Sequence, residues 1–304
     1  MINLNKIDTE KSNPASAKID QESTAGILEI INLQDRQVAL AVSRVLEDVA
    51  RAVDIITEKL SFGGRLIYLG SGTSGRLGVL DAEECPPTFG VDAGLVVGMM
   101  AGGSSAFVKA KEGAEDDREA GALDLKEIDF NAGDALVGIA ASGRTPYVMG
   151  GMAYAASLGA PVIALTCSSR SEMSKLAQIT IAPDSGPEVI TGSTRMKCGT
   201  AQKMVLNMIS TAVMIKLGKV YGNLMVDVKA SNQKLQKRAV NIVMQATGAE
   251  ASYAADTLLA CGGNCKMAIV AIKCSMTNKE AAQALEKEKG FINRVLENYC
   301  KDDN

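Results

Sequence analysis

The sequence predicts an α/β protein with a doubly wound parallel sheet, an N-terminal arm and helix, and a small all-helical C-terminal region. Short apolar runs alternate with helical patterns between about residues 65 and 217. Two of these runs end in loops rich in glycine and hydroxyl side chains, and beyond residue 230 the pattern is purely helical. Such alternation is typical of parallel strands joined by helices that cover both faces of one sheet.

The N-terminal part has two predicted elements. Residues 1–34 are polar and irregular, which predicts an arm. From Asp35 to about Leu60 apolar side chains recur at helical spacing, and Gly63-Gly64 follows, which predicts one long helix. The expected divisions are an arm and long helix over 1–56, an α/β domain over 57–220 and a helical region over 221–304.

Within the central domain we expect five strands and the helices between them. The apolar runs that predict strands are 65–69, 95–99, 135–140, 161–166 and 179–182. Helical patterns lie near 74–84, 104–122 and 146–158, and a long apolar helix is expected from about Arg195 to Leu217. Pro86 and Pro87 are expected to stop the first of these helices.

Composition excludes several classes of function. The 304 residues carry a net charge of −3, which gives no electrostatic case for binding nucleic acid or an anionic membrane. No apolar run reaches the length of a membrane-spanning helix and no signal sequence is evident, so a cytoplasmic protein is expected. The chain has no histidine, which excludes catalysis by its own imidazole groups.

Seven cysteines are present without a C-x-x-C pair. They are expected to be mostly small buried side chains in a reducing compartment, and no metal site is expected. Any acid–base chemistry then depends on carboxylates, Lys, Tyr or Cys.

Two loops predict a binding site for a phosphorylated small molecule. The run at 66–69 leads into Gly70-Ser71-Gly72-Thr73-Ser74-Gly75, and the run at 135–140 leads into Ala141-Ser142-Gly143-Arg144-Thr145-Pro146. A loop that ends at a helix N-terminus offers free backbone N–H groups, and glycines allow close approach of an anion. At the carboxyl ends of parallel strands, the two loops are expected to converge on one phosphate, held by Ser71, Thr73, Ser74, Ser142 and Thr145.

The first loop also fits the G-x-G-x-x-G pattern of dinucleotide-binding proteins. That function needs an acidic residue at the end of the second strand, about 20 residues on. The second strand here ends in Met99-Met100-Ala101-Gly102, without an acid. The pattern therefore favours a phosphate ester over a dinucleotide.

Three other segments carry chemical groups whose roles the residues alone leave open. Asp81-Ala82-Glu83-Glu84 at a helix end is either a solvated surface or a source of a general acid. Glu112–Asp117 is either surface or the second carboxylate of an acid–base pair. Gly192–Thr200, with Ser193 and Lys197, either caps the long apolar helix or forms a third wall of the anion site.

Taken together, these segments resemble the N-acetylmuramic acid 6-phosphate etherases. The resemblance is carried by Gly70–Gly78, Glu84-Cys85-Pro86-Pro87-Thr88, Glu112–Asp116, Ala140–Pro146 and Thr191–Lys197. It extends from Thr9-Glu10 through Gly222–Asp227 to Gly290-Phe291-Ile292, and so covers nearly the whole chain. At position 71 the chain has Ser where these etherases commonly have Ala.

The resemblance implies a sugar isomerase (SIS) domain with a five-stranded parallel sheet, in a homodimer that needs no cofactor. It implies cleavage of the D-lactyl ether of N-acetylmuramate 6-phosphate, with Glu84 as proton donor and Glu115 as second catalytic carboxylate. It also places Gly72, Gly143, Arg144, Ser193 and Lys197 among the substrate-binding residues. The rival function from another class is a non-catalytic sugar-phosphate sensor, like the glucokinase regulatory protein, since a fold alone does not separate the two.

Overall fold

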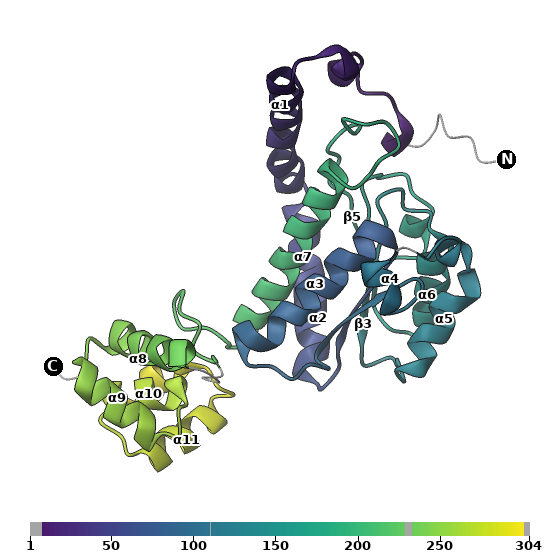
Figure 1. Ribbon diagram of the computed structural model, residues 1–304. Coiled ribbons are helices and arrows are strands. Elements are labelled where there is room, and N and C mark those ends of the chain that lie inside the picture. The colour runs from purple at the N-terminus through teal and green to yellow at the C-terminus, as the bar shows by residue number, and fades with distance from the viewer. Residues whose placement is uncertain (1–7, 110, 229–232, 301–304) are drawn as a thin grey trace. The chain divides into compact units, whose positions relative to one another are not determined.

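The computed structural model describes residues 8–109, 111–228 and 233–300 (Figure 1). The chain forms two compact units. The first, here called the sheet unit, comprises Met1–Glu83 and Ala93–Thr211, and the second, the helical unit, comprises Glu84–Asp92 and Ala212–Asn304. Each unit is therefore built from two separate stretches of chain.

The sheet unit contains five parallel strands in the order β2-β1-β3-β4-β5. Their bounds are β1 Leu66–Gly70, β2 Val96–Met100, β3 Ala135–Ile139, β4 Val162–Leu165 and β5 Ile179–Ile181. Every residue of β1, β3 and β4 is buried, as expected for strands that are covered on both faces. The predicted fold class, a doubly wound five-stranded parallel sheet, is confirmed.

Helices cover both faces of this sheet (Figure 1). One face carries α2 (Leu46–Ser61), α3 (Gly72–Phe89) and α7 (Lys197–Lys216), and the other carries α5 (Arg118–Glu127) and α6 (Pro146–Ser157). The crossover from β1 runs toward β2 and the crossover from β3 runs toward β4, so α3 and α6 leave neighbouring strands on opposite faces. Ligands of open α/β sheets bind at such a reversal of strand order.

The N-terminal prediction is wrong in two respects. Helix α1 (Thr24–Ser43) begins within the expected arm, because the Ser23 side chain accepts a hydrogen bond from the Gly26 N–H and so caps the helix. The single long helix expected from Asp35 to Leu60 is broken at Arg44-Val45, between α1 and α2.

The described residues before α1, from Asp8 on, form three short 3₁₀ turns, η2 (Asp8–Glu10), η3 (Pro14–Ser16) and η4 (Ile19–Gln21). Two of their side chains hold them to the loop after β5. Asn13 donates to the carbonyl of Pro187, and the Ser16 hydroxyl donates to the carbonyl of Val189. The described part of the arm is thus fixed to the sheet unit, and residues 1–7 of the predicted arm lie outside the described residues.

The helix expected over 104–122 is instead three short elements. They are α4 (Ser105–Val108), η5 (Ala114–Asp116) and α5, which begins at Arg118. Gly113 has a left-handed φ of 76°, and Asp117 caps α5 by accepting from the N–H groups of Glu119 and Ala120. A left-handed residue followed by a cap prevents one continuous helix.

The expected stop at the two prolines is also wrong. Pro86 and Pro87 lie within α3, which ends only at Phe89. The Gly90 N–H bonds to the Pro86 carbonyl, and Gly90 adopts the left-handed conformation that commonly ends a helix. Helix α3 therefore ends just before Gly90 and not at the proline pair.

In the described part of the helical unit, four helices pack around a fifth, α10. The helices are α8 (Gln233–Thr247), α9 (Ala251–Ala260), α10 (Cys265–Lys273), α11 (Asn278–Lys287) and α12 (Ile292–Tyr299). Ala268, Ile269 and Val270 of α10 have no exposed surface, and α10 contacts each of the other four helices. The helical character expected beyond residue 230 is confirmed.

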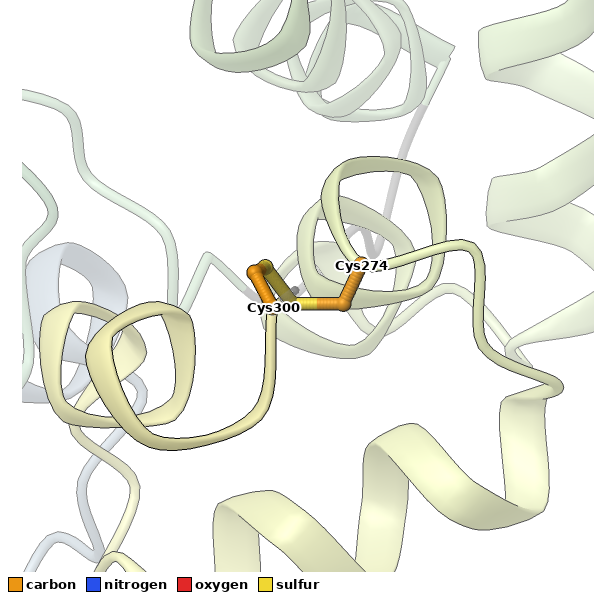
Figure 2. Close-up of a disulfide and its surroundings, with 2 residues drawn as sticks. All are labelled: Cys274 and Cys300. Carbon is orange, nitrogen blue, oxygen red and sulfur yellow. A yellow bond between two sulfur atoms is a disulfide. The ribbon is translucent and has the colours of Figure 1, made fainter. Parts of the chain in front are cut away.

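Two cysteines of the helical unit depart from the expected free thiols. Cys274 and Cys300, at the C-terminal ends of α10 and α12, form a disulfide (Figure 2). The two cysteines are 26 residues apart in the sequence, and no local pattern marks them as a pair. The buried free thiols, as expected from the sequence, are Cys85, Cys167, Cys198, Cys261 and Cys265.

Across the described ranges, no single helix is both long enough and apolar enough to cross a membrane. The α9–α10 pair meets the length and composition test when counted together, but it is bent by 117°.

Candidate active site at the carboxyl ends of β1 and β3

The loop after β1 depends on glycines that lie in close contact with their neighbours. A Cβ on Gly70 would lie 2.6 Å from the Gly75 nitrogen, and one on Gly75 would lie 2.7 Å from the Met100 Cβ. Gly72 has a left-handed φ of 53° and begins α3. The first N–H groups of α3 therefore face the end of the sheet, where a helix N-terminus attracts an anion.

The loop after β3 is held from the neighbouring segment after β4. Gly143 is left-handed, and a Cβ there would lie 2.2 Å from the Ser171 Cβ. The Thr166 hydroxyl donates to the Ala141 carbonyl, and the Met173 N–H donates to the Gly143 carbonyl. The loop leads into Pro146 at the first position of α6, so a second helix N-terminus lies beside the first.

The five hydroxyls expected to hold a phosphate fall into two groups. Ser71 donates to Glu115 and Ser74 donates to Gln202, both within the protein. Within residues 8–109, 111–228 and 233–300, the hydroxyls of Thr73, Ser142 and Thr145 have no protein partner. These three are the hydroxyls that are free to meet a ligand.

Gln202 is a residue that sequence reasoning missed. It lies on α7 with no exposed surface, and its Oε1 accepts from the Ser74 hydroxyl at 2.8 Å. Its Nε2 is buried without a hydrogen-bond partner among the described residues. Its partner Ser74 is 128 positions away, so no motif points to the pair.

Glu115 is brought directly to the first loop. It lies exposed on η5, and its Oε2 accepts a hydrogen bond of 3.0 Å from the Ser71 hydroxyl. A cavity of about 190 Å³ opens beside this pair, and its lining includes Gly72, Arg76 and Lys111. The Glu115 carboxylate thus lies beside a pocket at the ends of β1 and β2.

Arg76 lines the same cavity and was not singled out from the sequence. Its Nε donates to the carbonyl of Phe107 and its Nη2 donates to the carbonyl of Ala106, each at 2.8 Å. Both carbonyls belong to α4, on the segment that joins β2 to η5.

Glu84 lies exposed on α3, and this helix is unbroken at Gly78. It follows Gly72 by twelve residues, which at 1.5 Å each gives about 18 Å along the helix axis. Asp81, one turn earlier, is buried and accepts hydrogen bonds from Tyr68, Asn207 and Ser210. Burial raises the pKa of the Asp81 carboxyl, and these three donors oppose the increase.

The loop before α7 gives different roles to its two candidate residues. Ser193 is half-buried. Lys197, in contrast, is only 1% exposed, and its amino group donates to Gln34 of α1. Burial lowers the pKa of the Lys197 ammonium. In the structure the amino group of Lys197 thus makes an internal contact, and its expected contact with substrate stays a prediction.

The cap of α7 comes from Glu188, which sequence reasoning missed. Its two carboxylate oxygens accept from the N–H groups of Lys197 and Cys198, and it has no exposed surface. The sequence left open whether the loop 192–200 caps α7 or contacts an anion. The cap of α7 is supplied by Glu188, nine positions before Lys197.

Curated relatives decide the family. The chain is 56% identical over 296 residues to an N-acetylmuramic acid 6-phosphate etherase of Escherichia coli O1:K1, with 97% of this chain and 99% of the relative covered. An etherase of Shigella boydii serotype 18 has the same identity and coverage. The chain belongs to the N-acetylmuramic acid 6-phosphate etherase family.

Two domain families match parts of this etherase-family chain. Residues 48–156 match the glucokinase regulatory protein N-terminal SIS domain, and residues 125–212 match the SIS domain. Among solved structures, a phosphoheptose isomerase from Francisella tularensis covers 63% of this chain and 98% of its own, with a TM-score of 0.49 and 15% identity.

Proposed function

We propose that this chain cleaves the D-lactyl ether at C3 of N-acetylmuramic acid 6-phosphate. The products are N-acetylglucosamine 6-phosphate and D-lactate, so the reaction is that of a carbon–oxygen lyase followed by hydration. The observation that carries the proposal is the Ser71–Glu115 hydrogen bond. It supports a role of Glu115 as the base, because this carboxylate lies beside the loop proposed to bind the phosphate, in a chain 56% identical to named etherases.

The phosphate is assigned to the two helix N-termini. The backbone N–H of Gly72 and the hydroxyls of Thr73, Ser142 and Thr145 are its donors. Gly143, whose own N–H donates to the Ala140 carbonyl, lets the anion approach the loop closely. Ser71 and Ser74 join them when the ligand competes with Glu115 and Gln202 for their hydroxyl protons. Arg144 and Ser193 complete the substrate-binding set, and each charge-assisted hydrogen bond contributes about 1.5–3 kcal/mol.

The carboxylates divide the chemistry between them. In the open-chain sugar, the C1 aldehyde acidifies the C2 proton, which Glu115 removes. Glu84 protonates the C3 ether oxygen as the bond to lactate breaks, leaving a C2–C3 double bond. Water then adds at C3 with Glu84, now ionised, as its base, while a proton returns to C2. Protons and charge balance over the two steps.

The length of α3 supports an action of Glu84 in the partner subunit of a homodimer. Glu84 lies about 18 Å along α3 from the phosphate-binding end, whereas a hexose phosphate spans roughly 6 Å from phosphorus to C3. With α3 continuous through Gly78, the same helix does not hold the phosphate and deliver the acid to one sugar. A second copy related by a two-fold axis supplies Glu84 to the other pocket.

Subunit exchange tests this arrangement. Glu84→Gln and Ser142→Ala proteins, each of low activity, are mixed and heterodimers are confirmed by mass. If Glu84 acts across the dimer, one site of each heterodimer carries both defects and the other carries none, so activity returns. No gain in activity from confirmed heterodimers would place Glu84 in its own subunit's site.

Isotope labelling tests the reaction itself. Wild-type protein in deuterated water is expected to release D-lactate and to place deuterium at C2 of the product. In ¹⁸O-water the label is expected at C3 of the sugar and not in lactate. Glu115→Gln is expected to abolish the exchange at C2. Label in lactate would refute elimination, and tight binding of the substrate without release of lactate would support the regulator instead.

A cytoplasmic location in a pathway of cell-wall amino-sugar breakdown belongs to the same proposal. The substrate carries a phosphate and a carboxylate, and such charges do not cross the core of a bilayer unaided.

A further inference from the structure

We propose that Arg76 is a positioning residue that holds the Glu115-bearing segment against the first turns of α3. The inference rests on the proposed function, because it assigns Arg76 a part in proton removal at C2. Arg76 itself is not required to touch the substrate. Its role is to keep Glu115 at the pocket while the same helix holds the phosphate.

The first support is the geometry of the guanidinium group. Arg76 donates through Nε to the Phe107 carbonyl and through Nη2 to the Ala106 carbonyl. One planar guanidinium group thus forms hydrogen bonds with the carbonyls of two consecutive residues. These carbonyls lie in the four-residue helix α4, which ends at Val108. The last carbonyls of a helix have no partner within it, and Arg76 supplies one from another helix.

The second support is the backbone of the segment that Arg76 holds. Gly102, Gly103 and Gly113 all have left-handed φ values, of 86°, 73° and 76°. Such glycines lose much conformational freedom when a loop is ordered, so a segment bounded by them needs contacts to keep one conformation. Arg76 holds the segment between these glycines.

The third support is a second link from the same helix start. The Ser71 hydroxyl holds the Glu115 carboxylate itself, at 3.0 Å. Ser71 and Arg76 thus hold the two ends of one segment, and both line the cavity beside Glu115. Since η5 also packs on α6, loss of Arg76 is expected to displace Glu115 and not to unfold it.

The chain offers a matched control in Arg65. Arg65 also uses its guanidinium group on two consecutive carbonyls, Ile128 through Nη1 and Asp129 through Nη2. It lies just before β1, at the opposite end of the strand from the pocket. Arg65 also pairs with Asp134, so its replacement is the more disruptive of the two for stability.

The test compares Arg76→Lys with Arg65→Lys. Lysine keeps the charge but replaces the fork by a single ammonium. Arg76→Lys is expected to lower kcat for lactate release by about 10- to 100-fold, the effect of a misplaced catalytic group, and to slow C2 deuterium exchange equally. KM for the phosphorylated sugar is expected to change less than about 3-fold. Arg65→Lys is expected to keep kcat and to lose stability.

A second measurement needs no substrate. Amide hydrogen exchange of peptides covering 101–109 is expected to become faster in Arg76→Lys and to stay unchanged in Arg65→Lys. Wild-type kcat in Arg76→Lys, or unchanged exchange of this segment, would overturn the inference. If the wild-type protein releases no lactate, the proposed function fails, while the exchange result still decides whether Arg76 holds the segment.

Discussion

Asp81 offers a test of how the sheet unit holds α3 in place. Its carboxylate is 5% exposed and accepts from Tyr68 of β1 and from Asn207 and Ser210 of α7. Asp81→Ala would leave three donors without this acceptor, two of them on residues at most 4% exposed. At about 1–3 kcal/mol for each buried donor that loses its acceptor, these two donors alone give an expected loss of roughly 2–6 kcal/mol of unfolding free energy.

Asp81→Asn is the more informative change, because its cost depends on pH. Burial raises the folded-state pKa of Asp81, so the neutral acid is the form that the fold favours. The stabilisation associated with that form is fully present below the unfolded-state pKa near 4 and is lost as pH rises through the higher folded-state pKa. Asparagine has no such titration. The cost of Asp81→Asn is therefore expected to be larger near pH 4 than near pH 7.

The assay is urea unfolding of both proteins at several pH values, followed by hydrogen exchange in peptides of β1, α3 and α7. Peptides confined to residues 66–83 and 197–211 report on the sheet unit alone, which matters in a chain with two compact units. Tyr68→Phe, which removes one donor, is expected to reduce the cost of Asp81→Ala. A cost of Asp81→Asn that is constant or grows with pH, or a cost of Asp81→Ala below about 1 kcal/mol, would refute the reasoning.

Three other outcomes are expected. Gly98→Ala would place a Cβ 2.4 Å from the Val79 Cα, so β2 and α3 must move apart. Urea unfolding should then show a loss of roughly 1–3 kcal/mol in unfolding free energy, and an unchanged unfolding midpoint would contradict the close packing. Cys300→Ser should destabilise the helical unit by about 3–4 kcal/mol on a loop-closure basis, and a reductant should have the same effect on the wild type but none on the variant. Ser142→Ala should raise KM far more for the phosphorylated sugar than for its unphosphorylated form, and equal effects would remove Ser142 from the phosphate site.

The fold was predictable because its signals are local and repeated. Buried parallel strands appear as short apolar runs, and each helix between them has its own periodicity. The predicted helix boundaries are wrong where one or two residues determine where a helix begins or ends. Ser23 begins α1 within a polar stretch, and the break at Arg44-Val45 has neither glycine nor proline to announce it. Gly113 and Asp117 divide a region whose composition is helical throughout.

The site was predictable only in part, for the same reason. The two loops proposed to bind phosphate are contiguous glycine- and hydroxyl-rich motifs, which can be recognised directly in the sequence. Arg76, Gln202 and Glu188 act through partners 9 to 128 positions away, and nothing in the local sequence announces such pairs. Lys197 is a cation in a hydroxyl-rich motif, and the motif does not announce that its amino group is buried and donates to Gln34.

The helical unit has a consequence for any attempt to study it by truncation. It is discontinuous, because Glu84–Asp92 is separated from Ala212–Asn304 by more than a hundred residues of the other unit. The two stretches are in close contact at Gly90, where a Cβ would lie 2.1 Å from the Asp227 carbonyl oxygen. A chain ending at Thr211 would lose Asp227 and leave the segment that carries Glu84 without its packing partner. The C-terminal helices are thus not a detachable appendage, and a shortened protein that lacks activity would say nothing about whether those helices take part in catalysis.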